Sequence, residues 1–178
     1  AATGLAVGRL DGLGTSVVLR ELVACASDGE VPAALRPQVL EVVDRLAEII
    51  RDEQKAAGSD EPGRELAVVV VDSRTRPRMV RQLGHAAAAR LGARALGVVG
   101  LSGQEPPQHD VGSAFRLAQV ARSLTLQGWS AQALDELRER TVVLVDDWSD
   151  SGWTLTTASF LLREAGAAAV HPFVLAQR

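Results

Sequence analysis

The stretch that decides the fold is Thr141-Val-Val-Leu-Val-Asp-Asp-Trp-Ser-Asp-Ser-Gly-Trp-Thr154. Its four apolar residues at 142–145 predict a strand that is buried on both faces, as in a parallel sheet. Asp146 and Asp147 stand at the expected carboxyl end of this strand, and a short polar loop leads into an expected helix over 154–165. Ligands bind at that edge of parallel α/β sheets. The stretch therefore predicts both a fold class and the position of a ligand site.

Strands and helices alternate along much of the remaining chain. The expected elements are a strand at 66–71, a helix at 79–91, a strand at 95–99, a loop at 103–112, a helix around 115–121 and a last strand at 169–176. This alternation predicts an α/β fold, a three-layer sandwich around a mainly parallel sheet.

The amino-terminal part has a different pattern. Apolar residues at steps of three and four predict an amphipathic helix that opens at Pro32 and fades near residues 57–58. The first thirty residues are expected to form a short helical or capping region. The polar stretch 58–63 is expected to be a loop or a boundary. We therefore divide the chain into a helical cap with a linker, residues 1–62, and an α/β domain, residues 63–178.

Composition excludes several classes of protein. The 178 residues carry a net charge of −3 and are 47% hydrophobic and 23% charged, as in an ordinary globular protein. No apolar run approaches the ~20 residues that span a bilayer and no signal segment opens the chain, so we expect a cytoplasmic protein without membrane contact. Cys25 alone cannot form an internal disulfide. Lys55 is the single lysine among 19 basic residues, a bias typical of high-GC bacteria, and the start at Ala1 indicates a processed end or a piece of a longer protein.

The polar loop after the deciding strand has groups that bind a phosphate. Residues 149–154 would present backbone N–H groups, hydroxyls and a helix N-terminus, and Gly152 would let a ligand approach the backbone. Asp146 and Asp147 would repel a phosphate, but they can accept hydrogen bonds from hydroxyls or hold Mg²⁺ through water. A phosphate beside a diol describes a ribose 5-phosphate. The alternative is an acidic strand end followed by an ordinary helix cap, because serine caps helices well.

A second candidate anion site is Asp72-Ser-Arg-Thr-Arg-Pro-Arg78, which follows strand 66–71 and opens at the same edge of the sheet. Guanidinium groups bind phosphate oxygens through paired hydrogen bonds. Four arginines at the start of a helix oppose its dipole, which favours a bound anion. They are Arg74, Arg76, Arg78 and Arg81. The alternative is a solvated first helical turn.

Residues 142–154 resemble the phosphoribosyl-pyrophosphate signature of the type I phosphoribosyltransferases. In that signature, four apolar residues, two acidic residues and two variable residues precede an Asp/Ala-Thr/Ser-Gly-x-Thr loop. The resemblance implies the phosphoribosyltransferase fold, a phosphoribosyl pyrophosphate ligand, and Mg²⁺ held through water by the two acidic residues. These acidic residues would also hold the ribose hydroxyls, and Asp150 would lie near the reacting carbon as the catalytic candidate. The implied ligand-binding residues are Asp146, Asp147, Asp150, Ser151, Gly152, Trp153 and Thr154, with Ser73, Arg74, Thr75 and Arg76 for the pyrophosphate.

The wider chain resembles the carboxy-terminal domain of actinobacterial RecQ-family ATP-dependent DNA helicases. The matching segments are Leu10-Asp-Gly-Leu-Gly14, Leu19-Arg-Glu-Leu22, Ser73-Arg-Thr-Arg-Pro77, Ser113-Ala-Phe-Arg-Leu-Ala118, Gly152-Trp-Thr-Leu-Thr156 and His171-Pro-Phe-Val-Leu-Ala176. This resemblance implies a covalently attached helicase and a role in DNA repair. The chain itself has no helicase motor motif.

Three functions follow from these observations. The first is a regulatory or accessory domain that binds a phosphoribosyl or nucleotide ligand, because neither a catalytic hairpin nor a base-reading hood is recognisable. The second is an active phosphoribosyltransferase that releases pyrophosphate. The third is an accessory DNA-binding domain that uses Arg74, Arg76, Arg78 and Arg81. Trp148 and Trp153 flank the phosphate loop, and they would either stack on a base or ribose or close the site against the amino-terminal helices.

Overall fold

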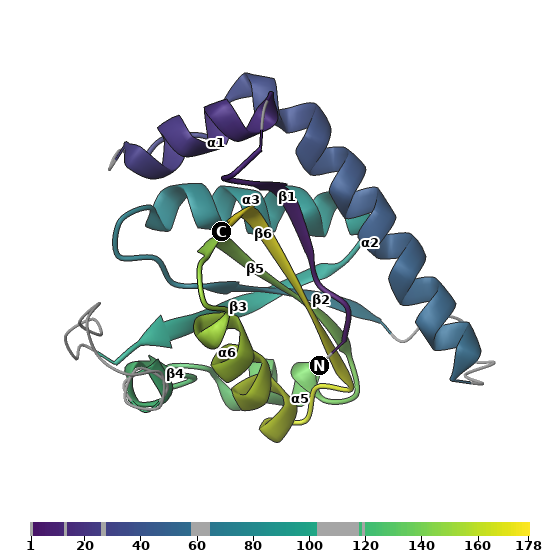
Figure 1. Cartoon of the computed structure of the whole chain (residues 1–178). Helices are drawn as coiled ribbons and strands as arrows, with labels where there is room; N and C mark the ends of the chain where they lie inside the picture. Colours follow the sequence, from purple (N-terminus) through teal and green to yellow (C-terminus); the bar gives the residue numbers. More distant parts are fainter. Residues whose placement is uncertain (1, 13, 26–27, 58–64, 103–117, 119) are drawn as a thin grey trace.

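The computed structural model describes residues 2–12, 14–25, 28–57, 65–102, 118 and 120–178. The chain forms a six-stranded sheet with helices on both faces (Figure 1). The strands are β1 (Leu5–Arg9), β2 (Leu66–Val71), β3 (Arg94–Leu101), β4 (Leu124–Thr125), β5 (Thr141–Ser149) and β6 (Ala169–Gln177). The helices are α1 (Thr15–Ala24), the short 3-10 helix η1 (Ala33–Leu35), α2 (Arg36–Ala56), α3 (Pro77–Leu91), α5 (Ala131–Leu137) and α6 (Trp153–Glu164).

The predicted α/β class and mainly parallel sheet are confirmed. The strand order is β1-β6-β5-β2-β3-β4, and every described pairing except β3 with β4 is parallel. β2 has the predicted bounds, and from Ala67 to Val71 it is buried. Continuous β-branched residues form such a strand because both faces of the sheet are covered by helices.

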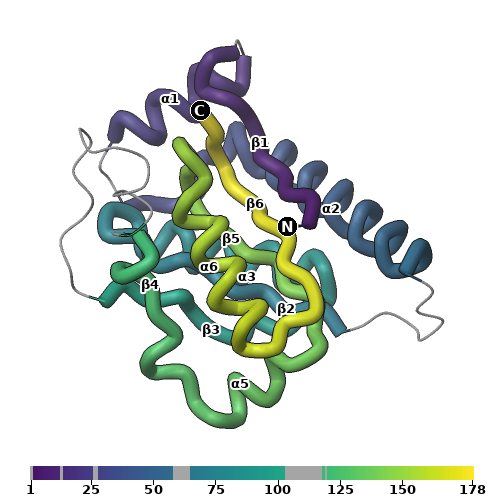
Figure 2. Tube along the Cα trace, turned by 60° about the horizontal axis from the view of Figure 1, so that its bottom comes forward, coloured from purple at the N-terminus to yellow at the C-terminus, as the bar shows by residue number. Residues whose placement is uncertain are grey.

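Two sequence predictions of secondary structure are wrong, and two further elements were not predicted. The first thirty residues are not wholly helical, because residues 5–9 form β1, which pairs with β6 at the edge of the sheet (Figure 2). β5 continues through Asp146 and Asp147 to Ser149, because its pairing with β6 extends to Gln177. The helix α5 and the two-residue strand β4 were not predicted. The expected loop at 103–112 and the boundary between residues 62 and 63 lie outside the described residues, as does most of the helix expected around residues 115–121.

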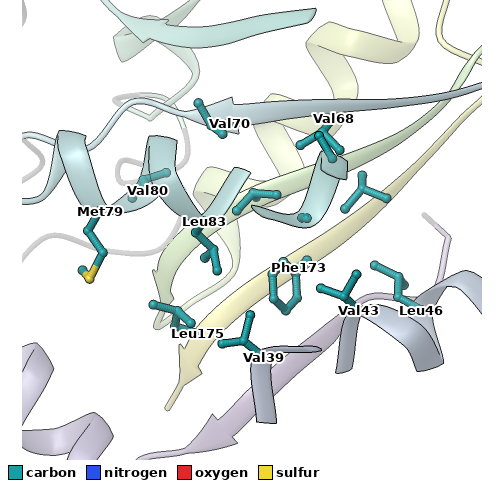
Figure 3. Packing of buried hydrophobic residues seen from close by; sticks show 14 of the residues in the cluster. Val39, Val43, Leu46, Val68, Val70, Met79, Val80, Leu83, Phe173 and Leu175 are labelled. Atoms are coloured by element: carbon teal, nitrogen blue, oxygen red, sulfur yellow. The ribbon is translucent and has the colours of Figure 1, made fainter. Parts of the chain in front are cut away.

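Alternate side chains of the strands form two hydrophobic cores, one on each face of the sheet. Val68 and Val70 of β2 face the core beneath α1, α2 and α3, whereas Val69 and Val71 face the core beneath α5 and α6. Figure 3 shows the first core, in which Phe173 of β6 lies among side chains of α2 and α3. This alternation gives the three layers predicted from the sequence.

The order of the strands places a topological switch between β2 and β5. The chain leaves β2 through α3 toward β3, but it leaves β5 through α6 toward β6 on the opposite side. β2 and β5 are parallel neighbours with Val70 beside Val145, so the loops that follow them open at the same edge of the sheet. A crevice at such a switch point is where open α/β sheets bind ligands.

Candidate functional site

The site predicted from the sequence is divided between two loops and the end of a strand. Residues 72–76 follow β2, residues 150–152 follow β5, and Asp146 and Asp147 lie within β5 itself. Both carboxylates are buried, with 6% and 9% of their residue surface exposed. They are therefore part of the packed sheet rather than of a solvated strand tip.

Arg76 turns inward and forms a buried ion pair with Asp147. Its Nη1 donates to Asp147 Oδ2 at 2.5 Å, and only 9% and 11% of the two side chains is exposed. Arg76 Nη2 donates to the carbonyl oxygen of Val23 at 2.8 Å, whereas its buried Nε has no hydrogen-bond partner. The contact brings together one residue predicted to bind pyrophosphate and one predicted to bind ribose hydroxyls, and it joins them to α1.

Asp146 lies beside this ion pair. Its Oδ1 accepts a hydrogen bond from the backbone N–H of Asp147 at 2.8 Å. Burial, followed by the negative charge of Asp147, raises the pKa of Asp146 well above the ordinary aspartate value. Folding therefore shifts the protonation equilibrium of Asp146 toward its neutral form relative to an exposed aspartate.

The loop after β5 is open to a ligand. Gly152 is the N-cap of α6 with φ +75°, and a Cβ built at this position would have no atom within 4 Å. No side chain caps α6, so the first backbone N–H groups of this helix face the loop. Asp150 and Ser151 are exposed, and Thr154 is half-buried. The Asp150 carboxylate lies 3.7 Å from Arg178 Nη1.

The start of α3 is different, because a carboxylate of the chain itself occupies it. Asp28 accepts hydrogen bonds from the backbone N–H groups of Arg78, at 2.9 and 3.1 Å, and of Met79, at 3.0 Å. Ser73 Oγ accepts a further bond from the backbone N–H of Arg76. The arginines around the start of α3 were predicted to favour a bound anion, and the Asp28 carboxylate of the chain itself is that anion. Sequence reasoning missed Asp28 because it lies 50 positions from Arg78 and belongs to no local pattern.

The remaining predicted residues lie around these two helix starts. Arg74, Thr75, Arg78 and Arg81 are exposed, and Arg81 Nη2 lies 3.5 Å from Asp72 Oδ1. Trp153 packs against the core beneath α6, and Trp148 is half-buried in β5.

The donor set does not fit a resident magnesium ion. Mg²⁺ is usually bound through one or two carboxylates together with waters and substrate phosphates, but the Asp147 carboxylate is already paired with Arg76, and burial of Asp146 disfavours its charged form. Within the described part of the chain, no cluster of three or more His, Cys, Asp or Glu could hold a metal ion. We therefore assign no metal-dependent role to these two carboxylates.

Comparisons with known proteins show which family the chain belongs to. The sequence pattern of the phosphoribosyl transferase domain matches residues 34–178. The chain belongs to this family. β1, α1 and Asp28 precede the matched region. No curated protein sequence matches the chain. The helices of the described residues do not combine the length and apolar character needed to cross a membrane.

Solved structures of hypoxanthine phosphoribosyl transferases are similar in fold. One is an HPRT with an invariant aspartic acid changed to glutamic acid, at 16% identity and a TM-score of 0.50, covering 80% of this chain and 66% of that chain. Its glutamine counterpart is 15% identical with a TM-score of 0.50 and the same coverage. The Trypanosoma cruzi enzyme is 17% identical with a TM-score of 0.49, covering 80% of this chain and 64% of that chain. This chain thus spans slightly less than two thirds of the length of these structures.

Proposed function

We propose that the chain binds a phosphoribosyl ligand at residues 150–154 and serves as a regulatory or accessory domain. The observation that carries this proposal is the uncapped start of α6 at the switch point, where Gly152 has a positive φ and faces open space. Backbone N–H groups at a helix N-terminus favour a phosphate. Membership of the phosphoribosyl transferase domain family makes the 5-phosphate of a ribose the natural ligand group.

Within this proposal, the loop residues have separate roles. The backbone N–H groups of 152–154 and the hydroxyls of Ser151 and Thr154 bind the 5-phosphate. Asp150 stands beside the ribose, and Trp153 borders the site from the first turn of α6. Asp146 accepts a hydrogen bond from the backbone of β5, which keeps the end of this strand in place beneath the loop.

Calorimetry with ribose 5-phosphate tests this site. Gly152→Asp is compatible with positive φ, but it places a carboxylate where the phosphate is expected. We expect at least about a tenfold loss of affinity, because like charges about 4 Å apart repel by about 1 kcal/mol in water and by more near a protein surface. The matched control is Gly92→Asp, since Gly92 has φ +61° and equally open space at the far end of α3. Equal affinities in both variants would reject the site.

An active transferase is the second candidate, and the partly exposed carboxylate of Asp150 at the open loop favours it. A pyrophosphate-release assay with phosphoribosyl pyrophosphate, Mg²⁺ and the common nucleobases distinguishes catalysis from binding alone. Release that Asp150→Asn abolishes would establish catalysis. If the wild-type protein releases pyrophosphate no faster than Asp150→Asn, the domain binds its ligand without catalysing transfer.

We further propose that the domain is attached to a RecQ-family helicase. The support for this proposal is the order and spacing of the matching sequence segments between Leu10 and Ala176 quoted above. The decisive observation is whether the encoding reading frame continues upstream into a helicase motor. A direct DNA-binding role loses one of its four arginines, because Arg76 is buried in its pair with Asp147.

A further inference from the structure

We infer that this site accepts a phosphomonoester, such as ribose 5-phosphate or a nucleoside 5′-monophosphate, and excludes a pyrophosphate group. The inference rests on the proposed function, since it concerns the ligand class of the same site. Val23 and Asp28 of the amino-terminal segment already accept hydrogen bonds from Arg76 and from the first turn of α3, the groups that a pyrophosphate would use at this loop.

The first observation is the inward position of Arg76. Its guanidinium donates to Asp147 and to the Val23 carbonyl oxygen, and only 9% of the Arg76 side chain is exposed to solvent. A guanidinium that binds a ligand phosphate must direct its N–H groups outward. Here both terminal nitrogens already donate to protein oxygens.

The second observation is the position of Asp28. Both of its carboxylate oxygens accept hydrogen bonds from the first turn of α3, which is the only long helix start beside the loop at 72–76 among the described elements. A carboxylate there satisfies the N–H groups that an incoming anion would use. It also repels a second anion at the same place.

The start of α6 provides the internal comparison. α3 and α6 begin at the same edge of the sheet, but only α3 is closed by a carboxylate, whereas α6 has no side-chain cap. One of two neighbouring anion positions is thus filled by the chain itself, and the other is available. A single phosphate fits this arrangement, and a ligand with a second phosphate arm does not.

The closing groups lie outside the region shared with the family. Asp28 and Val23 precede residue 34, where the family match begins. The exclusion of pyrophosphate is therefore a property of this chain's amino-terminal segment. Because Asp147 is neutralised by Arg76 rather than by a cation, binding of the phosphomonoester needs no Mg²⁺.

Calorimetry on the full chain tests the inference with three probes: ribose 5-phosphate, phosphoribosyl pyrophosphate and inorganic pyrophosphate. Each is titrated in EDTA and in excess Mg²⁺. We expect ribose 5-phosphate to bind in EDTA, with no gain from Mg²⁺, and to bind at least about tenfold more tightly than phosphoribosyl pyrophosphate. Inorganic pyrophosphate should not displace it at millimolar concentration. Tighter, Mg²⁺-dependent binding of phosphoribosyl pyrophosphate would overturn the inference and leave the proposed function intact, whereas no binding of either ribose compound would overturn the proposed function.

A variant locates the exclusion at Asp28. Asp28→Ala frees the first turn of α3, and we expect inorganic pyrophosphate to bind to it measurably. Asp11→Ala is the control, because Asp11 is an exposed aspartate in the same segment. No gain in a folded Asp28→Ala protein would overturn the role of Asp28. If that variant does not fold, Asp28→Asn removes the charge while keeping one acceptor oxygen, and it is judged by the same gain.

Discussion

Arg76 and Asp147 are 71 positions apart in the sequence, yet their side chains form a buried ion pair at 2.5 Å. This pair joins the loop after β2 to the strand β5, and through the Val23 carbonyl oxygen it also reaches α1. Arg76 thus connects the candidate site to both the sheet and the amino-terminal segment.

Breaking the pair from one side should destabilise the protein strongly. Arg76→Met leaves a buried, unpaired carboxylate, and we expect the free energy of unfolding in urea to fall by about 3–5 kcal/mol. The double variant Arg76→Met/Asp147→Leu removes both charges, and it should recover most of that loss, since apolar replacements of buried pairs are often neutral. A double variant no more stable than Arg76→Met would contradict the ion pair as the cause.

Asp146→Asn should stabilise the protein increasingly as pH rises. Folding raises the pKa of Asp146 above its ordinary value of 3.8. The protonated side chain therefore contributes its full share of the free energy of unfolding below pH 3.8, and this contribution is lost as the pH rises toward the folded pKa. Asparagine does not titrate, and its Oδ1 can still accept the hydrogen bond from Asp147. Melting temperatures between about pH 4 and about pH 8 should show the variant's advantage growing.

The opposite trend is expected for Asp44→Asn. The hydrogen bond from Arg90 lowers the pKa of Asp44, so its stabilising effect is present above 3.8 and is lost in acid. This pair joins α2 to α3 at the surface through two hydrogen bonds. Parallel pH trends in Asp44→Asn and Asp146→Asn would contradict the assigned cause.

Gly84→Ala should destabilise the packing of α3 on the sheet. A Cβ on Gly84 would overlap Val70 Cγ1 in the first core, and overpacking of this kind costs about 1–3 kcal/mol. In the double variant Val70→Ala/Gly84→Ala, the shorter side chain at position 70 leaves room for the new Cβ at position 84. Chemical denaturation should therefore give a favourable coupling energy between the two substitutions, and simple additivity would contradict direct contact.

Asp28→Ala should lower the stability of α3 independently of any ligand. Loss of a carboxylate that accepts bonds from helix N-terminal N–H groups costs about 0.5–2 kcal/mol. Asp28→Asn should cost less, because the amide oxygen still accepts a bond. Thermal unfolding without ligand provides the measurement, and equal stability of wild type and Asp28→Ala would show that these bonds contribute nothing.

Local patterns in the sequence predicted much of the fold. The β-branched run at 66–71 and the apolar stripe that contains Val39 and Leu46 each correspond to an observed element, because burial dictates such patterns locally. β1 escaped prediction because Leu5 and Val7 are only half-buried at the sheet edge, and their pairing partner lies in β6.

The sequence predicted the position of the candidate site, but it did not predict the contacts within the site. The pattern around Gly152 predicted the loop and its neighbouring helix, because both are local features. The pairing of Arg76 with Asp147 and the capping by Asp28 depend on tertiary contacts between distant segments, which composition and spacing do not contain.

The position of β1 has a consequence for any shortened form of this protein. β1 covers β6 with parallel pairs from Leu5 beside Phe173 to Arg9 beside Gln177. A fragment trimmed to residues 34–178, the extent of the family match, would leave β6 as an open edge with unpaired N–H and carbonyl groups. Such an edge adds strands from other molecules, so the fragment would self-associate. The amino-terminal segment therefore makes the five-residue β1, rather than the nine-residue β6, the outer edge of the sheet, and short edge strands are less prone to pair with other molecules.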